Sequence, residues 1–251
     1  MSASKPYEVC AGVYALGSEL VNWYLVEEGG RLTAIDAGLP GFAKRLDDDL
    51  SALGFKREQL AALVLTHSDA DHTGIAPHLK ESGVAVLIHE QDAETLRKPR
   101  AKGGEAAPIH MLPQLANPRL WALVVRFARD GAGRPRGVEP TRTFASGEEL
   151  DLPGRPRAIH TPGHTAGHCA ILCEGRGALF VGDALCTYNV LSGRRGSQLM
   201  PRQMNESTAE CAQSLGAIEG VAGQAVLPGH GEPFLGTPAE AVAQARERAG
   251  R

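Results

Sequence analysis

Short apolar runs alternate with amphipathic stretches along the first half of the chain. The runs are rich in apolar and β-branched residues and are bounded by turn residues, which is typical of strands. Apolar residues at steps of three and four over 39–53 predict a helix that begins near Pro40 and ends near Gly54. A second helix is expected to end at about Glu81. The strands are expected at 7–16, 20–26, 32–35, 61–65 and 84–88.

The second half repeats this order of strands followed by helices. Helices are expected at about 113–129 and 206–219, and from about 238 onward. Two halves of this kind predict an α/β fold with two sheets packed face to face and helices on the outside. The strands of the second half are expected at 142–144, 149–152, 157–159, 169–173, 178–181 and 224–227.

Four of the predicted strands end in a short loop that carries histidine or aspartate. Because functional side chains gather at the carboxyl ends of strands, these residues can converge although they lie far apart in the sequence. The four segments are ALVLTHSDADH (62–72), RAIHTPGHTAGH (157–168), ALFVGDAL (178–185) and AVLPGHG (225–231). Their metal-competent residues are His67, Asp69, Asp71, His72, His164, Asp183 and His230.

These residue types predict a metal centre. Imidazole and carboxylate ligands suit zinc, manganese and iron. Seven ligands exceed what one tetrahedral ion needs, so the set predicts two divalent ions about 3.5–4 Å apart that share a bridging carboxylate. Taken alone, Asp69 or Asp71 could instead cap the helix that follows. His160 and His168, four residues before and after His164, are candidates for orienting a ligand.

The composition favours one globular domain that does not bind nucleic acid. The 251 residues are 43% hydrophobic, which is enough for a sizeable core. Aromatic residues make up 5% and the net charge is −3, which argues against a nucleic-acid-binding surface. The five cysteines form no CxxC pair, the N-terminus shows no secretory signal, and the apolar runs are too short to cross a membrane. We therefore expect a cytoplasmic protein with no membrane partner.

Positive charge is concentrated in one segment, residues 97–142. Ten lysines and arginines stand there against three acidic residues. We interpret this segment as a basic helical insertion, which is either a solvated surface or a flap that attracts an anionic substrate. We expect a small-molecule substrate, which the second interpretation predicts to be negatively charged, and a homodimer is left open.

In these motifs the chain resembles the metallo-β-lactamase superfamily of metal-dependent hydrolases. The resemblance runs from NWYLVEEGGRLTAIDAG (22–38) through TPGHTAGH and FVGDA to LPGHG. It implies one domain over residues 1–251, folded as a four-layer αββα sandwich with the metal site at one edge between the sheets. The family's first motif is His-x-His-x-Asp-His. Residues 67–72 read His-Ser-Asp-Ala-Asp-His, so Asp69 replaces the second histidine of the motif.

The resemblance also implies a role for each candidate ligand. His67 and His164 would bind the first metal, Asp71, His72 and His230 the second, and Asp183 would bridge the two. Asp69 can reach the first metal in place of the missing histidine. It adds a negative charge and a harder ligand, which shifts the expected preference from zinc toward iron or manganese. The alternative is a weakened first site and an enzyme with one metal.

Hydrolysis by a metal-activated hydroxide is the leading functional hypothesis. The resemblance favours a thioester, a lactone or another ester as the substrate, and Asp71 would orient the nucleophile as well as bind metal. Two alternatives remain open. Asp69 motivates a non-haem iron oxidoreductase on the same fold. A protein that keeps the scaffold with a degraded metal site would bind a ligand without catalysis.

Overall fold

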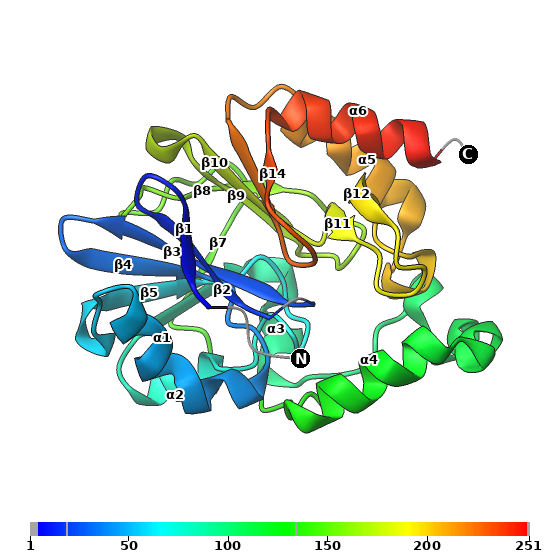
Figure 1. Ribbon diagram of the computed structural model, residues 1–251, viewed down its shortest axis with the longest axis horizontal. Helices are drawn as coiled ribbons and strands as arrows, with labels where there is room; N and C mark the ends of the chain where they lie inside the picture. The colour runs from blue at the N-terminus through cyan, green and yellow to red at the C-terminus, as the bar shows by residue number, and fades with distance from the viewer. Residues whose placement is uncertain (1–4, 19, 134, 250–251) are drawn as a thin grey trace.

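Two β-sheets lie face to face in the computed structural model, which describes residues 5–18, 20–133 and 135–249 (Figure 1). The first sheet has seven strands in the order of the chain, antiparallel from β1 to β4 and parallel from β4 to β7. Its strands are β1 (Tyr7–Cys10), β2 (Val13–Gly17), β3 (Asn22–Glu28), β4 (Arg31–Ile35), β5 (Leu60–Val64), β6 (Ala85–His89) and β7 (Arg142–Phe144).

The second sheet has five strands in the order β14-β13-β10-β9-β8. Only β10 and β13 run parallel to each other. A separate two-stranded ribbon stands beside this sheet. The strands are β8 (Arg157–His160), β9 (Cys169–Cys173), β10 (Ala178–Gly182), β13 (Ala225–Pro228) and β14 (Phe234–Leu235), and those of the ribbon are β11 (Cys186–Tyr188) and β12 (Arg195–Gln198).

Helices cover the outer face of each sheet, so the chain forms the predicted αββα sandwich. The first sheet packs against α1 (Leu46–Ala52), α2 (Ala76–Glu81) and α3 (Ala93–Arg97), and the second against α5 (Thr208–Glu219) and α6 (Pro238–Ala249). Short 3-10 helices are η1 (Pro40–Arg45), η2 (Arg57–Gln59), η3 (Glu90–Asp92), η4 (Gly104–Ala106), η5 (Pro108–Ala116), η6 (Glu174–Arg176) and η7 (Arg202–Met204).

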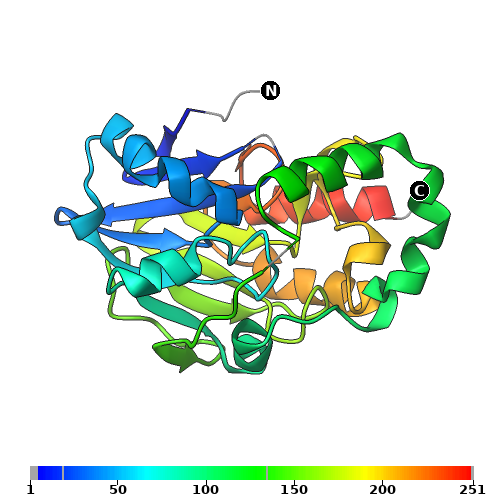
Figure 2. The ribbon, with the colours of Figure 1, turned by 90° about the horizontal axis from the view of Figure 1, so that it is seen from below.

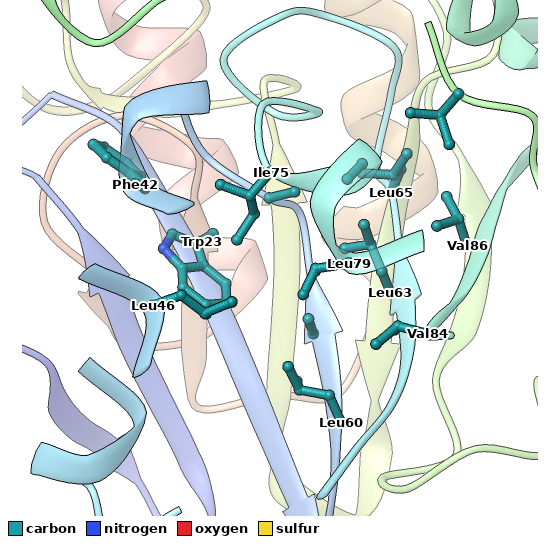
Figure 3. Close-up of a cluster of buried hydrophobic side chains, with 14 of the residues drawn as sticks. Trp23, Phe42, Leu46, Leu60, Leu63, Leu65, Ile75, Leu79, Val84 and Val86 are labelled. Atoms are coloured by element: carbon teal, nitrogen blue, oxygen red, sulfur yellow. The ribbon is translucent and has the colours of Figure 1, made fainter. Parts of the chain in front are cut away.

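Strand β5 shows how the alternation of side chains builds both cores. Leu63 and Leu65 point to the outer face and pack with Leu79 of α2 (Figure 3). Ala62 and Val64 point to the other face and pack between the two sheets. Because both faces of β5 are buried, the strand is held firmly where its carboxyl end meets the loop that begins at Thr66.

The middle of the predicted insertion, residues 108–129, lies outside the sandwich and packs on Val190 and Leu191 between β11 and β12 (Figure 2). The predicted helix over 113–129 is wrong in its extent, because the chain forms η5 and then α4 (Pro118–Arg129). The break falls at Asn117, whose side chain accepts a hydrogen bond from Arg119 N at 3.0 Å and so begins a new helix. Proline at the first position of α4 fits this start.

Three other predictions from the pattern were wrong. The predicted strand 149–152 is a single bridge between Glu149 and Arg157, since the chain turns at Gly154. The predicted strand 7–16 is two strands, because Gly12 adopts a φ of +74° in the turn between them. The predicted helix 39–53 begins as η1 before it becomes α1. Strands β11, β12 and β14 were not predicted.

Within the described residues, no helix is both long enough and apolar enough to cross a membrane.

The first prediction concerns the contribution of buried Leu63 on β5 to the stability of the fold. Leu63 is fully buried, so Leu63→Ala is expected to lower the free energy of unfolding by about 2–5 kcal/mol through a cavity under the metal-site loop. Leu235→Ala is the matched control, because Leu235 is 72% exposed and its loss should change the free energy by less than about 0.5 kcal/mol. Urea unfolding followed by circular dichroism measures both. Equal effects of the two substitutions would contradict the assignment of Leu63 to the core.

Candidate metal centre

The seven predicted metal ligands lie together where four loops leave the carboxyl ends of strands. Each loop brings its ligands from a different part of the sequence to the edge between the sheets. His67, Asp69, Asp71 and His72 follow β5, His164 follows β8, Asp183 follows β10, and His230 follows β13.

The ligand atoms form three overlapping groups, and within each group all of them lie within 4.8 Å of one another. Asp183 stands at the centre: its Oδ2 is 3.2 Å from His164 Nε2 and 3.2 Å from His230 Nε2. Its Oδ1 is 3.4 Å from His72 Nε2. The groups are His67, Asp69 and His164; His67, His72 and Asp183; and Asp71, His72 and His230.

The four histidines are held by the ring nitrogen that faces away from the centre. A carboxylate, carbonyl or hydroxyl oxygen accepts a hydrogen bond from Nδ1, which leaves the Nε2 lone pair for a metal. The Nδ1 contacts are His67 to Thr66 Oγ1 at 2.9 Å, His72 to Asp36 Oδ2 at 2.8 Å, His164 to Asn205 Oδ1 at 3.0 Å and His230 to Leu20 O at 2.6 Å.

Three buried polar atoms at the centre have no hydrogen-bond partner among the described residues. They are His67 Nε2, His72 Nε2 and Asp183 Oδ1. A buried polar atom left unpaired costs about 1–3 kcal/mol. The three belong to one of the groups of ligand atoms, so a single cation can satisfy all of them. The donor set therefore fits a divalent metal with nitrogen and oxygen ligands.

The charges at the centre also suit a cation. Burial alone would raise the pKa of Asp183, but the neighbouring imidazoles, His230 foremost, outweigh it and hold that pKa well below its usual range. Burial alone would lower the pKa of His230, but Asp183 raises it to about 9. Protons thus balance the carboxylate in the metal-free protein, and binding of a metal would release them.

Two aspartates that the sequence analysis missed tie the loops together. Asp92, which is 3% exposed, accepts hydrogen bonds from Ser68 N at 2.9 Å, Thr165 Oγ1 at 2.8 Å and Gly167 N at 2.8 Å. It therefore joins the loop after β5 to the loop after β8.

Asp36 is the second of these aspartates, and it holds His72 and Thr66 from the end of β4. Its Oδ1 accepts from Thr66 N at 2.8 Å, while its Oδ2 contacts His72 Nδ1. Its φ of +62° lies in the left-handed region, where aspartate is tolerated. The segment LTAIDAG (32–38) has the same form as the four recognised motifs, an apolar strand followed by an acidic turn. That signal could have identified Asp36.

His168 orients a ligand, as predicted, and His160 does not. His168 Nε2 accepts a hydrogen bond from Asp183 N at 3.0 Å, and its Nδ1 contacts Thr161. Burial lowers the pKa of His168 to about 3, so this ring is a neutral acceptor. His160 instead stacks on His89, with ring centroids 4.6 Å apart.

Lys102 is the contact at the centre that the sequence analysis did not foresee. This residue of the basic insertion places Nζ 2.5 Å from Asp69 Oδ2 and 2.8 Å from His164 Nε2. Burial alone would raise the pKa of Asp69, but Lys102 and a hydrogen bond with His164 hold that pKa well below its usual range. The sequence gives Lys102 no motif, since it is one of ten basic residues in the segment.

One cavity opens at the centre, and a second lies beside it. The smaller, of about 300 Å³, is lined by Asp71, Asp183, His230 and other residues of the centre. The larger, of about 730 Å³, lies between α4 and the ends of β2 and β11. Leu123 and Val190 line both, so the two spaces share a wall.

The sequence model of the Metallo-beta-lactamase superfamily matches residues 16–230. The chain belongs to the metallo-β-lactamase superfamily. A Bacillus subtilis protein named "Probable metallo-hydrolase YflN" is 28% identical over 240 residues, which cover 92% of this chain and 88% of that one. A hydroxyacylglutathione hydrolase of Alkalilimnicola ehrlichii is 29% identical over 163 residues, which cover 65% of this chain and 46% of that one. The chain is thus a metal-dependent hydrolase of this superfamily.

Solved structures confirm the predicted fold. A Cronobacter sakazakii metallo-β-lactamase with a HARLDQ motif superposes with a TM-score of 0.70 at 21% identity, over 99% of this chain and 94% of that one. The Rm3 metallo-β-lactamase superposes with a TM-score of 0.71 at 19% identity, over 99% of this chain and 93% of that one.

The second prediction tests Asp183 as a ligand. Zinc added to chelator-treated protein at about 100 times its dissociation constant stabilises the fold by about 2.7 kcal/mol. For a chain of this size that raises the melting temperature by about 5–10 °C. Asp183→Ala is expected to lose most of this rise, because it removes the carboxylate that all three neighbouring imidazoles face. Differential scanning fluorimetry measures the rise.

The control for Asp183 is His78→Ala. His78 lies on α2 and contacts Arg57 at 2.8 Å, away from the metal centre. This variant should keep the full zinc-dependent rise. An undiminished rise in Asp183→Ala would show that the carboxylate does not hold metal.

Proposed function

We propose that the chain hydrolyses a small anionic thioester, lactone or other ester with the help of metal, zinc being the first ion to test. The observation that carries this proposal is the pair of cavities. The smaller is lined by candidate metal ligands, namely Asp69, Asp71, His164, Asp183 and His230, and the larger is lined by arginines.

The residues present can hold metal on two sides of Asp183. Asp71, His72 and His230 would hold it on one side, and the group of His67, Asp69 and His164 provides donors on the other. When bound, the metal supplies a Lewis acid that makes water available as hydroxide at neutral pH and polarises a carbonyl.

Asp71 is the residue best placed to orient the nucleophile. It lines the smaller cavity, and its Oδ2 is 3.4 Å from His230 Nε2. Its side chain is 15% exposed, whereas that of Asp183 is 3% exposed. Asp71 therefore offers a carboxylate oxygen both to the centre and to a molecule in the cavity. Asp183 also lines this cavity, but it is enclosed by three imidazoles and is best placed to bind metal.

The larger cavity is suited to a negatively charged group. Arg119 and Arg126 of α4 and Arg195 of β12 line it. Glu232 is the one acidic residue among its lining residues, and it lies 3.4 Å from Arg195. An ester whose reacting carbonyl enters the smaller cavity would extend its charged end past Leu123 toward these arginines.

The similarity to a relative named hydroxyacylglutathione hydrolase supports the inclusion of thioesters among the substrates to test. Purification without chelator and plasma mass spectrometry of bound metal form the first experiment, followed by a screen of anionic esters, lactones and thioesters. The proposal is supported if the natural protein contains zinc and hydrolyses one of these compounds, and if Asp183→Ala loses that activity. Iron with turnover of an oxidant, and no hydrolysis, would favour the oxidoreductase instead.

The third prediction tests the arginine-lined cavity. Arg119→Glu is expected to raise KM for an anionic ester by about tenfold, because a charge-assisted contact of about 1.5 kcal/mol is lost. Its KM for a neutral ester should stay nearly constant. Steady-state kinetics with the two esters measure the difference.

Arg129→Glu is the matched control for Arg119→Glu. It makes the same change of charge on the same helix at an exposed position that does not line the cavity. If Arg129→Glu raises KM for the anionic ester as much as Arg119→Glu, the effect is one of overall charge, and the cavity is not the anion site.

A further inference from the structure

Lys102 is held at the centre by three polar contacts of its ammonium group. Its side chain is only 15% exposed. The three protons of its ammonium group have three acceptors: Asp69 Oδ2 at 2.5 Å, His164 Nε2 at 2.8 Å and Met204 O at 3.1 Å. The positive charge therefore lies between two of the residues that would bind the first metal.

The hydrogen bonds of Asn205 determine which nitrogen of His164 carries the proton. Asn205 Nδ2 donates to Met200 O at 3.4 Å and to Thr208 Oγ1 at 3.2 Å. The amide is thereby oriented so that its Oδ1 accepts from His164 Nδ1 at 3.0 Å. His164 Nε2 is then the unprotonated nitrogen, with a single lone pair in the plane of the ring.

That lone pair can accept a hydrogen bond from Lys102 or bind a metal, but it cannot do both. Asp69 has further lone pairs, so the competition is decided at His164. Without a cation on this side, the Nε2 lone pair would face Asp69 Oδ2 at 3.1 Å and Asp183 Oδ2 at 3.2 Å. Lys102 supplies this cation from the chain itself.

The loop that carries Lys102 is docked against the neighbours of His164. Glu105 N donates to Glu206 O at 3.0 Å, and a carboxylate oxygen of Glu105 accepts from Thr208 N at 3.2 Å. Gly104 has a φ of +60°, and a Cβ there would lie 2.0 Å from Glu206 O. Only glycine permits this approach, so the backbone that holds Lys102 is closely fitted to the segment that holds Asn205.

On the other side of Asp183, no lysine or arginine of the described residues pairs with the candidate ligands. Among the ion pairs of the described residues, Asp71 pairs only with His230. His72 Nε2 has no hydrogen-bond partner among the residues that the structure describes. The chain thus places a lysine against the candidate ligands on one side of Asp183, whereas on the other side the described ion pairs join only imidazoles and carboxylates.

We propose that the Lys102 ammonium takes the place of the first metal, so that the chain binds one metal tightly, at Asp71, His72 and His230 beside Asp183. This inference rests on the proposed function, because it assumes that the centre holds metal. In this arrangement one metal ion and the Lys102 ammonium together supply the positive charge of the centre. Lys102 is then a residue that determines how many ions the enzyme carries.

The experiment is a metal titration of the whole chain after chelator treatment, by equilibrium dialysis against zinc with plasma mass spectrometry. One tightly bound zinc per chain is expected in the natural protein. In Lys102→Met a second zinc is expected to bind at least about tenfold more tightly than in the natural protein, since no charge-assisted hydrogen bond has to be broken first. The affinity for the first zinc should not change.

Lys98→Met is the matched control. It removes a lysine of the same segment whose side chain is 82% exposed and pairs with Glu94. It should bind one zinc, like the natural protein. Asp69→His provides a second variant, because it removes the carboxylate partner of Lys102 and adds an imidazole. It should also bind a second zinc more tightly.

The outcomes separate this inference from the proposed function. Two zinc ions of similar affinity in the natural protein would overturn the role of Lys102 and leave the hydrolase intact. Thermal unfolding would show whether Lys102→Met is folded. A folded variant that binds the second zinc no more tightly than the natural protein would also overturn the role of Lys102. No zinc in the natural protein would overturn the proposed function and the inference together.

Discussion

The burial of the Asp183 carboxylate is the constraint on which the metal centre depends. A carboxylate that is 2% exposed costs several kcal/mol unless positive charge and hydrogen bonds surround it. Three imidazoles provide that environment, and each arrives on a different loop. Gly229 permits the close approach, because a Cβ there would lie 2.6 Å from Asp183 Oδ1. The four loops are therefore bound to one another through a single charge.

The sandwich makes it possible to bury this carboxylate, because the strands determine where each loop begins. Strand β5 is buried on both faces, and β10 and β13 run parallel, so their carboxyl ends lie at the same edge. Asp36 and Asp92 then hold the loops from behind through backbone and side-chain hydrogen bonds. Rigid strands and buried carboxylates thus determine the positions from which the imidazoles face one another.

The sequence revealed the parts of the molecule whose signals are local. Apolar runs followed by histidine or aspartate identified β5, β8, β10 and β13 together with the seven candidate ligands in the loops that follow them. The same rule, applied to LTAIDAG, would have added Asp36. Strands β11 and β12 were missed because they are three and four residues long, and β12 reads Arg-Gly-Ser-Gln without alternation.

Lys102 and Asn205 could not be predicted, because their roles depend on contacts across long separations in the sequence. Lys102 lies 62 residues from His164, and Asn205 lies 41 residues from it. Neither stands in a repeating pattern, and a lysine in a basic segment is ordinarily a solvated residue. Residues 104–106 dock on residues 205–208, and this contact brings Lys102 and Asn205 to the two nitrogens of the His164 ring.

The basic insertion therefore contacts both the centre and the arginine-lined cavity. Leu120 and Leu123 of α4 pack with Val190 and Leu191, which fixes the wall that the two cavities share. The same insertion carries Lys102 to His164. A hydrolase with one metal has less positive charge to stabilise a developing oxyanion than one with two, and the ammonium beside Asp69 restores one such charge. The segment that shapes the cavity is thus also the segment that sets the charge of the centre.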